Sequence, residues 1–257
     1  MTKIIIDNDF KQEVIDIVKK ANQSIMNVYS NSDFDIKLKD DNSPLTEADL
    51  SAHQTISTGL KKINSQIPIV SEEDTNSTYL AKNSQLYWLL DPLDGTKEFI
   101  KRSGEFTCNI ALIKNSQPLY GFVGVPASGT IFHGGKNKDS FKITTKSKQT
   151  QINCSPQKKP IRIIMSKSHI NKETLNYIKK LNSEYTTVQA GSSLKFLKIA
   201  EGEADLYPRL GLTSEWDTAA AHAILEGAGG SVRQLNGEKL VYNKENILNP
   251  FFIAKGI

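Results

Sequence analysis

Four segments of the chain carry carboxylates in settings suited to metal chemistry. The first is the triplet Glu72-Glu73-Asp74, which follows a short apolar run at residues 67–70. Three adjacent carboxylates at the end of a strand repel one another unless a cation or solvent separates them. A solvated loop explains this triplet equally well on its own, so its meaning depends on the other three segments.

The second segment is the run Asp91-Pro92-Leu93-Asp94-Gly95-Thr96, which ends an apolar strand. Pro92 restricts Asp91 to an extended conformation, and a turn between Asp91 and Asp94 can direct both carboxylates to one point. The same turn can leave the Leu93 carbonyl available to a hard cation, and the N–H groups that follow it available to an anion. An Asx turn closed by Asp-Gly is the structural alternative.

The other two segments place an acid where a helix begins. Asp217 lies in Glu215-Trp216-Asp217-Thr218, and Asp49 closes Thr46-Glu47-Ala48-Asp49, which matches a capping box. Helix capping alone explains both acids. It does not exclude catalysis, because a cap fixes a side chain where a reaction can use it.

Hydrophobic periodicity predicts the elements that hold these segments in the first part of the chain. Apolar residues recur at helical spacing over residues 9–29 and 46–63. Apolar runs predict strands at residues 67–70, 87–90, 109–113, 119–125 and 130–133, the last three forming an antiparallel meander. A polar stretch at residues 142–157 predicts a solvated edge strand or loop, and a domain seam. This part is therefore expected to be helices packed on a sheet.

After Pro160 the pattern alternates between strand and helix. Strands are predicted at residues 161–165, 185–189, 204–207 and 251–254, with helices at 172–181, 192–201 and 217–227. We therefore expect an amino-terminal α+β part over residues 1–158, which carries most of the acidic segments, and a carboxy-terminal α/β part over residues 159–257. No internal repeat is visible.

Composition restricts the classes of function. The chain has 257 residues, 38% of them hydrophobic, and a net charge of +4, which is too weak a surplus for a dedicated nucleic-acid binder. The two cysteines cannot build a disulfide framework, and no apolar run is long enough for a spanning helix or a signal peptide. We expect a cytoplasmic globular protein that acts on a small anion.

The acidic segments together carry a family resemblance. In order and spacing, Glu72-Glu73-Asp74, Asp91-Pro92-Leu93-Asp94-Gly95-Thr96 and Trp216-Asp217-Thr218-Ala219-Ala220 resemble the signature motifs of the inositol monophosphatase superfamily of metal-dependent, lithium-sensitive phosphatases. The continuation through Lys97-Glu98-Phe99-Ile100-Lys101-Arg102 to Gly104-Glu105-Phe106-Thr107 is most similar to its bacterial 3'(2'),5'-bisphosphate nucleotidase branch. Residues 41–46, 166–169 and 191–196 extend the likeness to nearly the whole chain. Ala221 replaces a common Gly without removing a ligand.

The resemblance implies a fold and a metal site. The fold would be a layered α-β-α-β-α sandwich, mixed α+β and α/β, with the metals at the seam between its two parts. Glu72, Asp91 and the Leu93 carbonyl would bind one Mg²⁺, and Asp91, Asp94 and Asp217 a second, with two or three ions per site. Four carboxylates and a carbonyl suit Mg²⁺, which prefers oxygen ligands and is completed by water and phosphate. Two ions would clamp the attacking and leaving oxygens of an in-line displacement.

The resemblance also implies catalytic and substrate contacts. Thr96, oriented by Asp49, would position and deprotonate the attacking water together with Glu72. The implied contacts with substrate are Glu72, Leu93, Asp94, Gly95, Thr96, Ser166, His169, Gly191, Lys195, Arg209 and Asp217. The basic residues Lys97, Lys101 and Arg102 follow the metal turn and are candidates for holding a second phosphate.

From this resemblance we expect a Mg²⁺-dependent phosphatase that removes the 3'-phosphate of adenosine 3',5'-bisphosphate to give AMP, in sulfur assimilation and nucleotide recycling. Inositol phosphates or fructose 1,6-bisphosphate are alternative substrates, because the metal motifs are common to all of these enzymes. A non-catalytic nucleotide or anion binder is the alternative from another class. Some relatives attach to the cytoplasmic face of a membrane, and the oligomeric state stays open.

Overall fold

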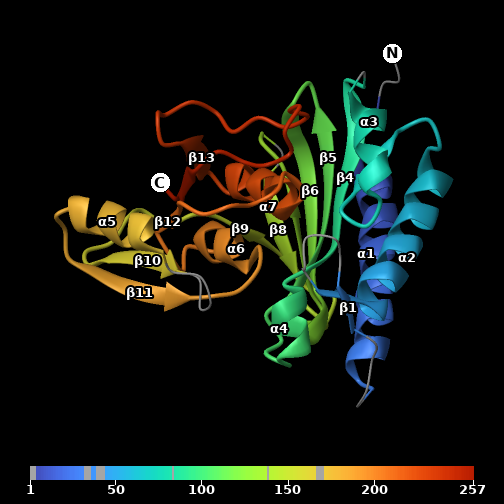
Figure 1. The fold of residues 1–257 in the computed structure, drawn as a ribbon, viewed down its shortest axis with the longest axis horizontal. Helices are drawn as coiled ribbons and strands as arrows, with labels where there is room; N and C mark the ends of the chain where they lie inside the picture. The colour runs from blue at the N-terminus through green and yellow to red at the C-terminus, as the bar shows by residue number, and fades with distance from the viewer. Residues whose placement is uncertain (1–3, 32–35, 39–43, 83, 138, 166–170) are drawn as a thin grey trace.

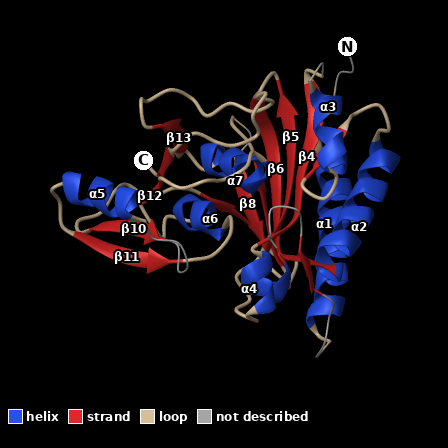
Figure 2. Ribbon diagram, viewed as in Figure 1, coloured by secondary structure: helices blue, strands red, loops and turns tan. Residues whose placement is uncertain are grey.

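The molecule is built of layers in the order helix, sheet, helix, sheet, helix (Figures 1 and 2). The computed structural model describes residues 4–31, 36–38, 44–82, 84–137, 139–165 and 171–257. The first layer is the helix pair α1 (Asn8–Tyr29) and α2 (Glu47–Ile63), the central layer is α6 (Leu194–Ala200) with α7 (Trp216–Gly227), and α5 (Lys172–Lys180) lies outermost. The layered sandwich expected from the resemblance is confirmed.

A seven-stranded sheet separates the first helical layer from the central one. Its strands follow chain order: β3 (Ile69–Ser71), β4 (Leu86–Asp94), β5 (Thr107–Lys114), β6 (Gln117–Val125), β7 (Thr130–Gly134), β8 (Ser140–Ile143) and β9 (Gln149–Ile152). All neighbours are antiparallel except β3 and β4, which run parallel with Ser71 opposite Leu90. Both strands therefore end at the same edge of the sheet, which places Glu72 beside Asp91.

The second sheet has five strands in the spatial order β11-β10-β12-β14-β13. Their bounds are β10 (Ile161–Met165), β11 (Tyr185–Gln189), β12 (Leu206–Arg209), β13 (Ser231–Gln234) and β14 (Phe252–Lys255). β14 is the last of these strands in the chain, yet it lies between β12 and β13 and is antiparallel to both. Shorter elements complete the fold: β1 (Ile36–Leu38), β2 (Pro44–Thr46), α3 (Thr78–Ala81) and α4 (Thr96–Ile100).

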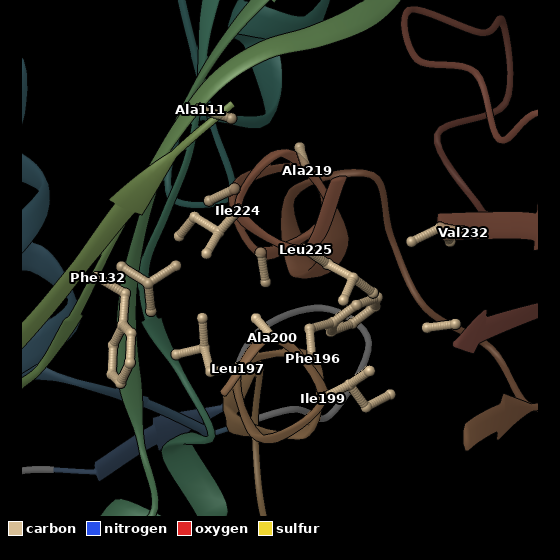
Figure 3. Close-up of a cluster of buried hydrophobic side chains, with 14 of the residues drawn as sticks. Ala111, Phe132, Phe196, Leu197, Ile199, Ala200, Ala219, Ile224, Leu225 and Val232 are labelled. Atoms are coloured by element: carbon tan, nitrogen blue, oxygen red, sulfur yellow. The ribbon is translucent and has the colours of Figure 1, made fainter. Parts of the chain in front are cut away.

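The central helices fill the space between the sheets. Figure 3 shows Leu197 of α6 and Ile224 of α7 facing each other beside Phe132 of the seven-stranded sheet. At the closest approach, a Cβ on Gly121 of β6 would overlap the carbonyl oxygen of Ala220. Only glycine lets α7 lie this close to the sheet. This contact sets how closely α7 packs on the seven-stranded sheet.

The amino terminus of α2 is held by the predicted capping box. The carboxylate of Asp49 accepts hydrogen bonds from the backbone N–H of Thr46 at 2.7 Å and from its hydroxyl at 2.6 Å. Asp49 is fully buried, so its side chain has one orientation in the first turn of the helix.

Most predicted elements lie within two or three residues of the observed ones. The polar stretch at residues 142–157 was predicted to be an edge strand or a loop. It contributes the edge strand β9 of the large sheet. The sequence did not predict α3, α4, β1, β2, β8 or β13. No helix in the described part of the chain is long and apolar enough to cross a membrane.

Candidate active site

Three carboxylates meet where β3, β4 and α7 converge. Oxygen atoms of Glu72, Asp91 and Asp217 all lie within 4.8 Å of one another. The parallel pairing of β3 and β4 brings the first two together, and the Glu72 N–H donates to the Leu90 carbonyl at 3.1 Å. Asp217 enters from the first turn of α7 and accepts a hydrogen bond from the Ser214 N–H at 2.9 Å. Segments 145 residues apart along the chain thus form one cluster.

The electrostatics of this cluster call for a cation. Asp91 is fully buried, and burial together with the charges of Glu72 and Asp94 raises its pKa well above the usual value. Burial and the charges of Asp94 and Glu72 raise the pKa of Asp217 to about 8. One buried and two half-buried carboxylates that repel one another are the donor set that a divalent, oxygen-preferring ion neutralises. The residues therefore fit the Mg²⁺ that the sequence implies.

The turn that follows Asp91 has the geometry of an Asx turn. The Asp91 carboxylate accepts a hydrogen bond from the Leu93 N–H at 3.2 Å, and the pairing of β4 with β5 shifts register before Asp94. Gly95 has φ = 92°, a left-handed conformation that suits glycine, and α4 begins directly after it. The Asx turn is therefore observed, and the same turn leaves the Asp91 carboxylate beside those of Glu72 and Asp217.

Thr96 and Asp49 lie in hydrogen-bond contact, as the resemblance implies. The Thr96 hydroxyl is 3.3 Å from one carboxylate oxygen of Asp49 and 3.3 Å from the Leu93 carbonyl. Thr46 holds the other carboxylate oxygen of Asp49. A hydroxyl that donates to a fixed carboxylate keeps its lone pairs free to accept a hydrogen bond from a water molecule.

Asp94 faces the second half of the molecule. One of its oxygens accepts hydrogen bonds from the Ser192 hydroxyl at 2.5 Å and from the Ser193 N–H at 2.7 Å. Burial raises its pKa, against the opposing charge of Lys195. Asp94 is not part of the group of three carboxylates described above. Sequence reasoning missed these serine donors, although they lie in the quoted run at residues 191–196.

A cavity of about 160 Å³ extends from these acids to the second half. It is lined by Asp94, Gly95, Glu98, Gly191, Ser192, Lys195, Phe196, Tyr207, Arg209, Thr213, Asp217, Thr218 and Phe252. The ammonium group of Lys195 donates to the Ser192 carbonyl at 2.5 Å and lies 5.6 Å from the centre of the Tyr207 ring. Burial lowers the pKa of Lys195 to about 8. Arg209 donates to the Leu212 carbonyl at 2.7 Å. Two cationic side chains therefore face the same cavity as the carboxylates.

Comparison with known proteins assigns the family. The model of the inositol monophosphatase family matches residues 8–251. The chain belongs to this family. Among its relatives is the 3'(2'),5'-bisphosphate nucleotidase CysQ of Escherichia coli strain K12, which is 42% identical over 242 residues, or 93% of this chain and 97% of that protein. The corresponding protein of Haemophilus influenzae is 34% identical and covers 86% of this chain and 83% of its own length.

Solved structures agree with this family. The crystal structure of CysQ from Bacteroides thetaiotaomicron, a bacterial member of the inositol monophosphatase family, has a TM-score of 0.87 and 36% identity, and covers 98% of each chain. An inositol monophosphatase from Thermotoga maritima has a TM-score of 0.77 at 20% identity, with 96% and 92% of the two chains covered. At that identity the likeness concerns the inositol monophosphatase fold alone.

Not every predicted site residue is found near the cluster of Glu72, Asp91 and Asp217. Ser166 and His169 lie outside the described residues. The guanidinium of Arg102 donates to the carbonyls of Tyr29 and Asn31 and lies 5.0 Å from the centre of the Tyr29 ring. Arg102 thus anchors the end of α1, and it is absent from the lining of the cavity. Its interpretation as a phosphate contact finds no support in this geometry.

Proposed function

We propose that the protein is a Mg²⁺-dependent 3'(2'),5'-bisphosphate nucleotidase that hydrolyses the 3'-phosphate of adenosine 3',5'-bisphosphate to give AMP and phosphate. The observation that carries the proposal is the position of Asp217 and Asp94 in the same cavity as Lys195 and Arg209. Carboxylates suit a metal that binds the phosphate under attack, and the cations suit the phosphate that stays on the product. The 42% identity to CysQ over 93% of the chain supports the same substrate.

The residues proposed to hold the metal are Glu72, Asp91, Asp94, Asp217 and the Leu93 carbonyl, with two or three Mg²⁺ per site. Bound Mg²⁺ would supply the positive charge that phosphoryl transfer requires. The carboxylates would then be ionised, because the cation opposes the burial and mutual repulsion that raise the pKa values of Asp91, Asp94 and Asp217.

The attacking water is proposed to be positioned by the contact of Thr96 with Asp49. The Thr96 hydroxyl donates to Asp49, so its oxygen accepts a hydrogen bond from the water and helps to point the water's lone pair at the phosphorus. Glu72 accepts the proton that the water loses. The proposed substrate contacts are the N–H groups of Gly95 and Thr96 and the side chains of Lys195 and Arg209, together with Ser166, His169 and Gly191. The Gly191 N–H itself donates to Glu105 at 3.0 Å.

We propose that the two parts of the chain contribute different groups to the site. Residues 1–158 contribute all the proposed metal ligands except Asp217, and residues 159–257 contribute Asp217 and the nucleotide contacts. The substrate is a small by-product of sulfate activation, and we propose that the reaction takes place in the cytoplasm. We do not retain peripheral membrane attachment, because neither the site nor the names of the relatives support it.

The test is phosphate release from adenosine 3',5'-bisphosphate, inositol 1-phosphate and fructose 1,6-bisphosphate, with Mg²⁺ and with EDTA. The variants are Asp91→Asn and the exposed control Asp16→Asn, which changes the same charge on α1. We expect Mg²⁺-dependent release that is fastest with the adenosine bisphosphate, kept in Asp16→Asn and reduced by about a thousandfold or more in Asp91→Asn.

Each other outcome has a distinct meaning. Faster release from inositol 1-phosphate or fructose 1,6-bisphosphate would retain the metal site and overturn the nucleotide assignment. Nucleotide binding in calorimetry with no release from any of the three substrates would favour a non-catalytic binder. Release that survives EDTA would overturn the metal assignment.

A further inference from the structure

A histidine outside the proposed machinery contacts the strand end that carries Glu72. His53 lies on α2, and its Nδ1 atom is 2.8 Å from the hydroxyl of Ser71. Ser71 is the last residue of β3, immediately before Glu72, and it is fully buried. A neutral imidazole can donate or accept through this nitrogen, and a hydroxyl can do the same, so the contact forms with either tautomer.

The Ser71 hydroxyl also organises the backbone around Glu72. It accepts a hydrogen bond from the Glu73 N–H at 3.3 Å, and the Ser71 N–H donates to the Ser77 hydroxyl at 3.1 Å. The Glu72 N–H donates to the Leu90 carbonyl at 3.1 Å. The backbone on both sides of Glu72 is therefore fixed, and the His53 contact connects this arrangement to α2.

His53 and Asp49 are four residues apart, so they lie on the same face of α2 in successive turns. Asp49 contacts Thr96, and His53 contacts the residue before Glu72. Thr96 and Glu72 are the two groups proposed to act on the attacking water. The same helix thus contacts both segments and adds to the pairing of β3 with β4 in fixing the distance between them, which a reaction with a single water molecule requires.

We propose that His53 is a positioning residue that sets the place of Glu72, through Ser71, relative to Thr96. The proposal rests on the roles given above to Glu72 and Thr96. It assigns His53 no contact with substrate or metal. Its effect is geometric, because it acts through the hydrogen bond between its Nδ1 atom and the Ser71 hydroxyl.

His53 also lines a separate cavity of about 290 Å³ between α2 and the approach to β3, with Lys61, Asp74 and Leu80 among its neighbours. A purely structural His53 would only fill the wall of this cavity. Its removal would then lower thermal stability without changing the metal site. The experiment therefore measures metal binding and catalysis separately from stability.

The variants are His53→Ala, His53→Asn, Ser71→Ala and the double variant His53→Ala with Ser71→Ala. Asparagine is the rescue variant, because its amide atoms are attached to Cγ as Nδ1 is in histidine. The matched control is Gln54→Ala, the next residue of α2, whose amide donates to Thr58 within the same helix at 2.9 Å. Mn²⁺ affinity is measured by calorimetry without substrate, and kcat and KM with adenosine 3',5'-bisphosphate.

We expect His53→Ala to bind Mn²⁺ about tenfold more weakly and to have a kcat about tenfold lower, with KM changed less than twofold, as found when outer-shell partners are lost. His53→Asn should recover most of both losses, and Gln54→Ala should match the wild type. The double variant should be no worse than Ser71→Ala alone, because the two residues act through one contact.

Unchanged Mn²⁺ affinity and kcat in His53→Ala would overturn the proposal, and so would losses that multiply in the double variant. The calorimetry separates this inference from the proposed function. If the wild type releases no phosphate but Mn²⁺ affinity depends on His53, the proposed function fails and the positioning of Glu72 stands. If the wild type is active and His53→Ala is as well, only the positioning role fails.

Discussion

Removing the carboxylate of Asp217 is expected to stabilise the metal-free protein near neutral pH. Burial and the charges of Asp94 and Glu72 raise the pKa of Asp217 from 3.8 to about 8. Between these two values the folded protein keeps a proton that the unfolded chain has released. The free energy of unfolding therefore falls as pH rises through this window, by about 1.4 kcal/mol per pH unit for one proton.

From pH 5 to pH 7 this difference amounts to about 3 kcal/mol. Asp217→Asn should lack this contribution, because its amide does not titrate and its oxygen still accepts the hydrogen bond from the Ser214 N–H. For a chain of this size the difference corresponds to about 6–12 °C in Tm. In EDTA, the Tm of the wild type should therefore fall by about 6–12 °C more than the Tm of the variant when the pH rises from 5 to 7.

The measurement is thermal unfolding followed by circular dichroism at pH 5, 6 and 7, in EDTA and in excess Mg²⁺. Mg²⁺ should reverse the order at pH 7, because it stabilises the wild type by binding the ionised carboxylate and binds the variant weakly. The surface variant Asp16→Asn controls for the loss of one negative charge. Equal pH dependence of Tm in wild type and Asp217→Asn would refute the electrostatic account of the cluster.

Three further predictions concern single residues. Thr96→Val should lower kcat by about a hundredfold and leave Mn²⁺ affinity within about threefold, measured by initial rates and calorimetry, because it removes the hydroxyl proposed to hold the water. Arg162→Ala should lower the free energy of unfolding by about 3–5 kcal/mol in urea titrations, because Arg162 pairs at 2.6 Å with Asp205, whose side chain is 2% exposed. Gly121→Ala should lower the free energy of unfolding by about 3 kcal/mol or more in the same titration, because its Cβ overlaps the backbone of α7. The control Gly256→Ala, whose Cβ would meet only ordinary contacts, should change the free energy of unfolding by less than about 1 kcal/mol.

Sequence patterns predicted the long elements well because each carries a strong local signal. The apolar stripe of α1 and the capping box of α2 specify where those helices begin without reference to the rest of the chain. By contrast, α4 spans only Thr96–Ile100 and follows a left-handed glycine, so it is too short to show helical periodicity. The strand β13 was missed because its four residues alternate weakly.

The candidate site was predicted in part. The carboxylates of Glu72, Asp91 and Asp217 could be grouped because strand ends and helix starts are visible in sequence and resemble the motifs of one family. The hydrogen bonds from Ser192 and Ser193 to Asp94 join residues almost 100 positions apart. Such contacts depend on how the two sheets stack on the central helices, which no local pattern encodes.

Among the basic residues that follow Asp94, Arg102 shows the opposite case. Lys97, Lys101 and Arg102 are close in sequence and suggested a common phosphate contact. The short helix α4 instead turns Arg102 toward the end of α1, where it binds backbone carbonyls. Charge clustering in sequence predicts clustering in space only when the secondary structure between the residues is known.

The place of β14 bears on how the chain is synthesised. Residues 252–255 form the strand that joins β12 to β13, so a nascent chain that already contains residues 161–234 still lacks the strand that connects β13 to the rest of its sheet. The seven-stranded sheet, whose strands pair in chain order, can form much earlier on the ribosome. Until β14 emerges, β12 and β13 present unpaired edges to solvent and to other chains. We therefore expect this late interval of translation to be when chaperone binding matters most for the yield of folded protein.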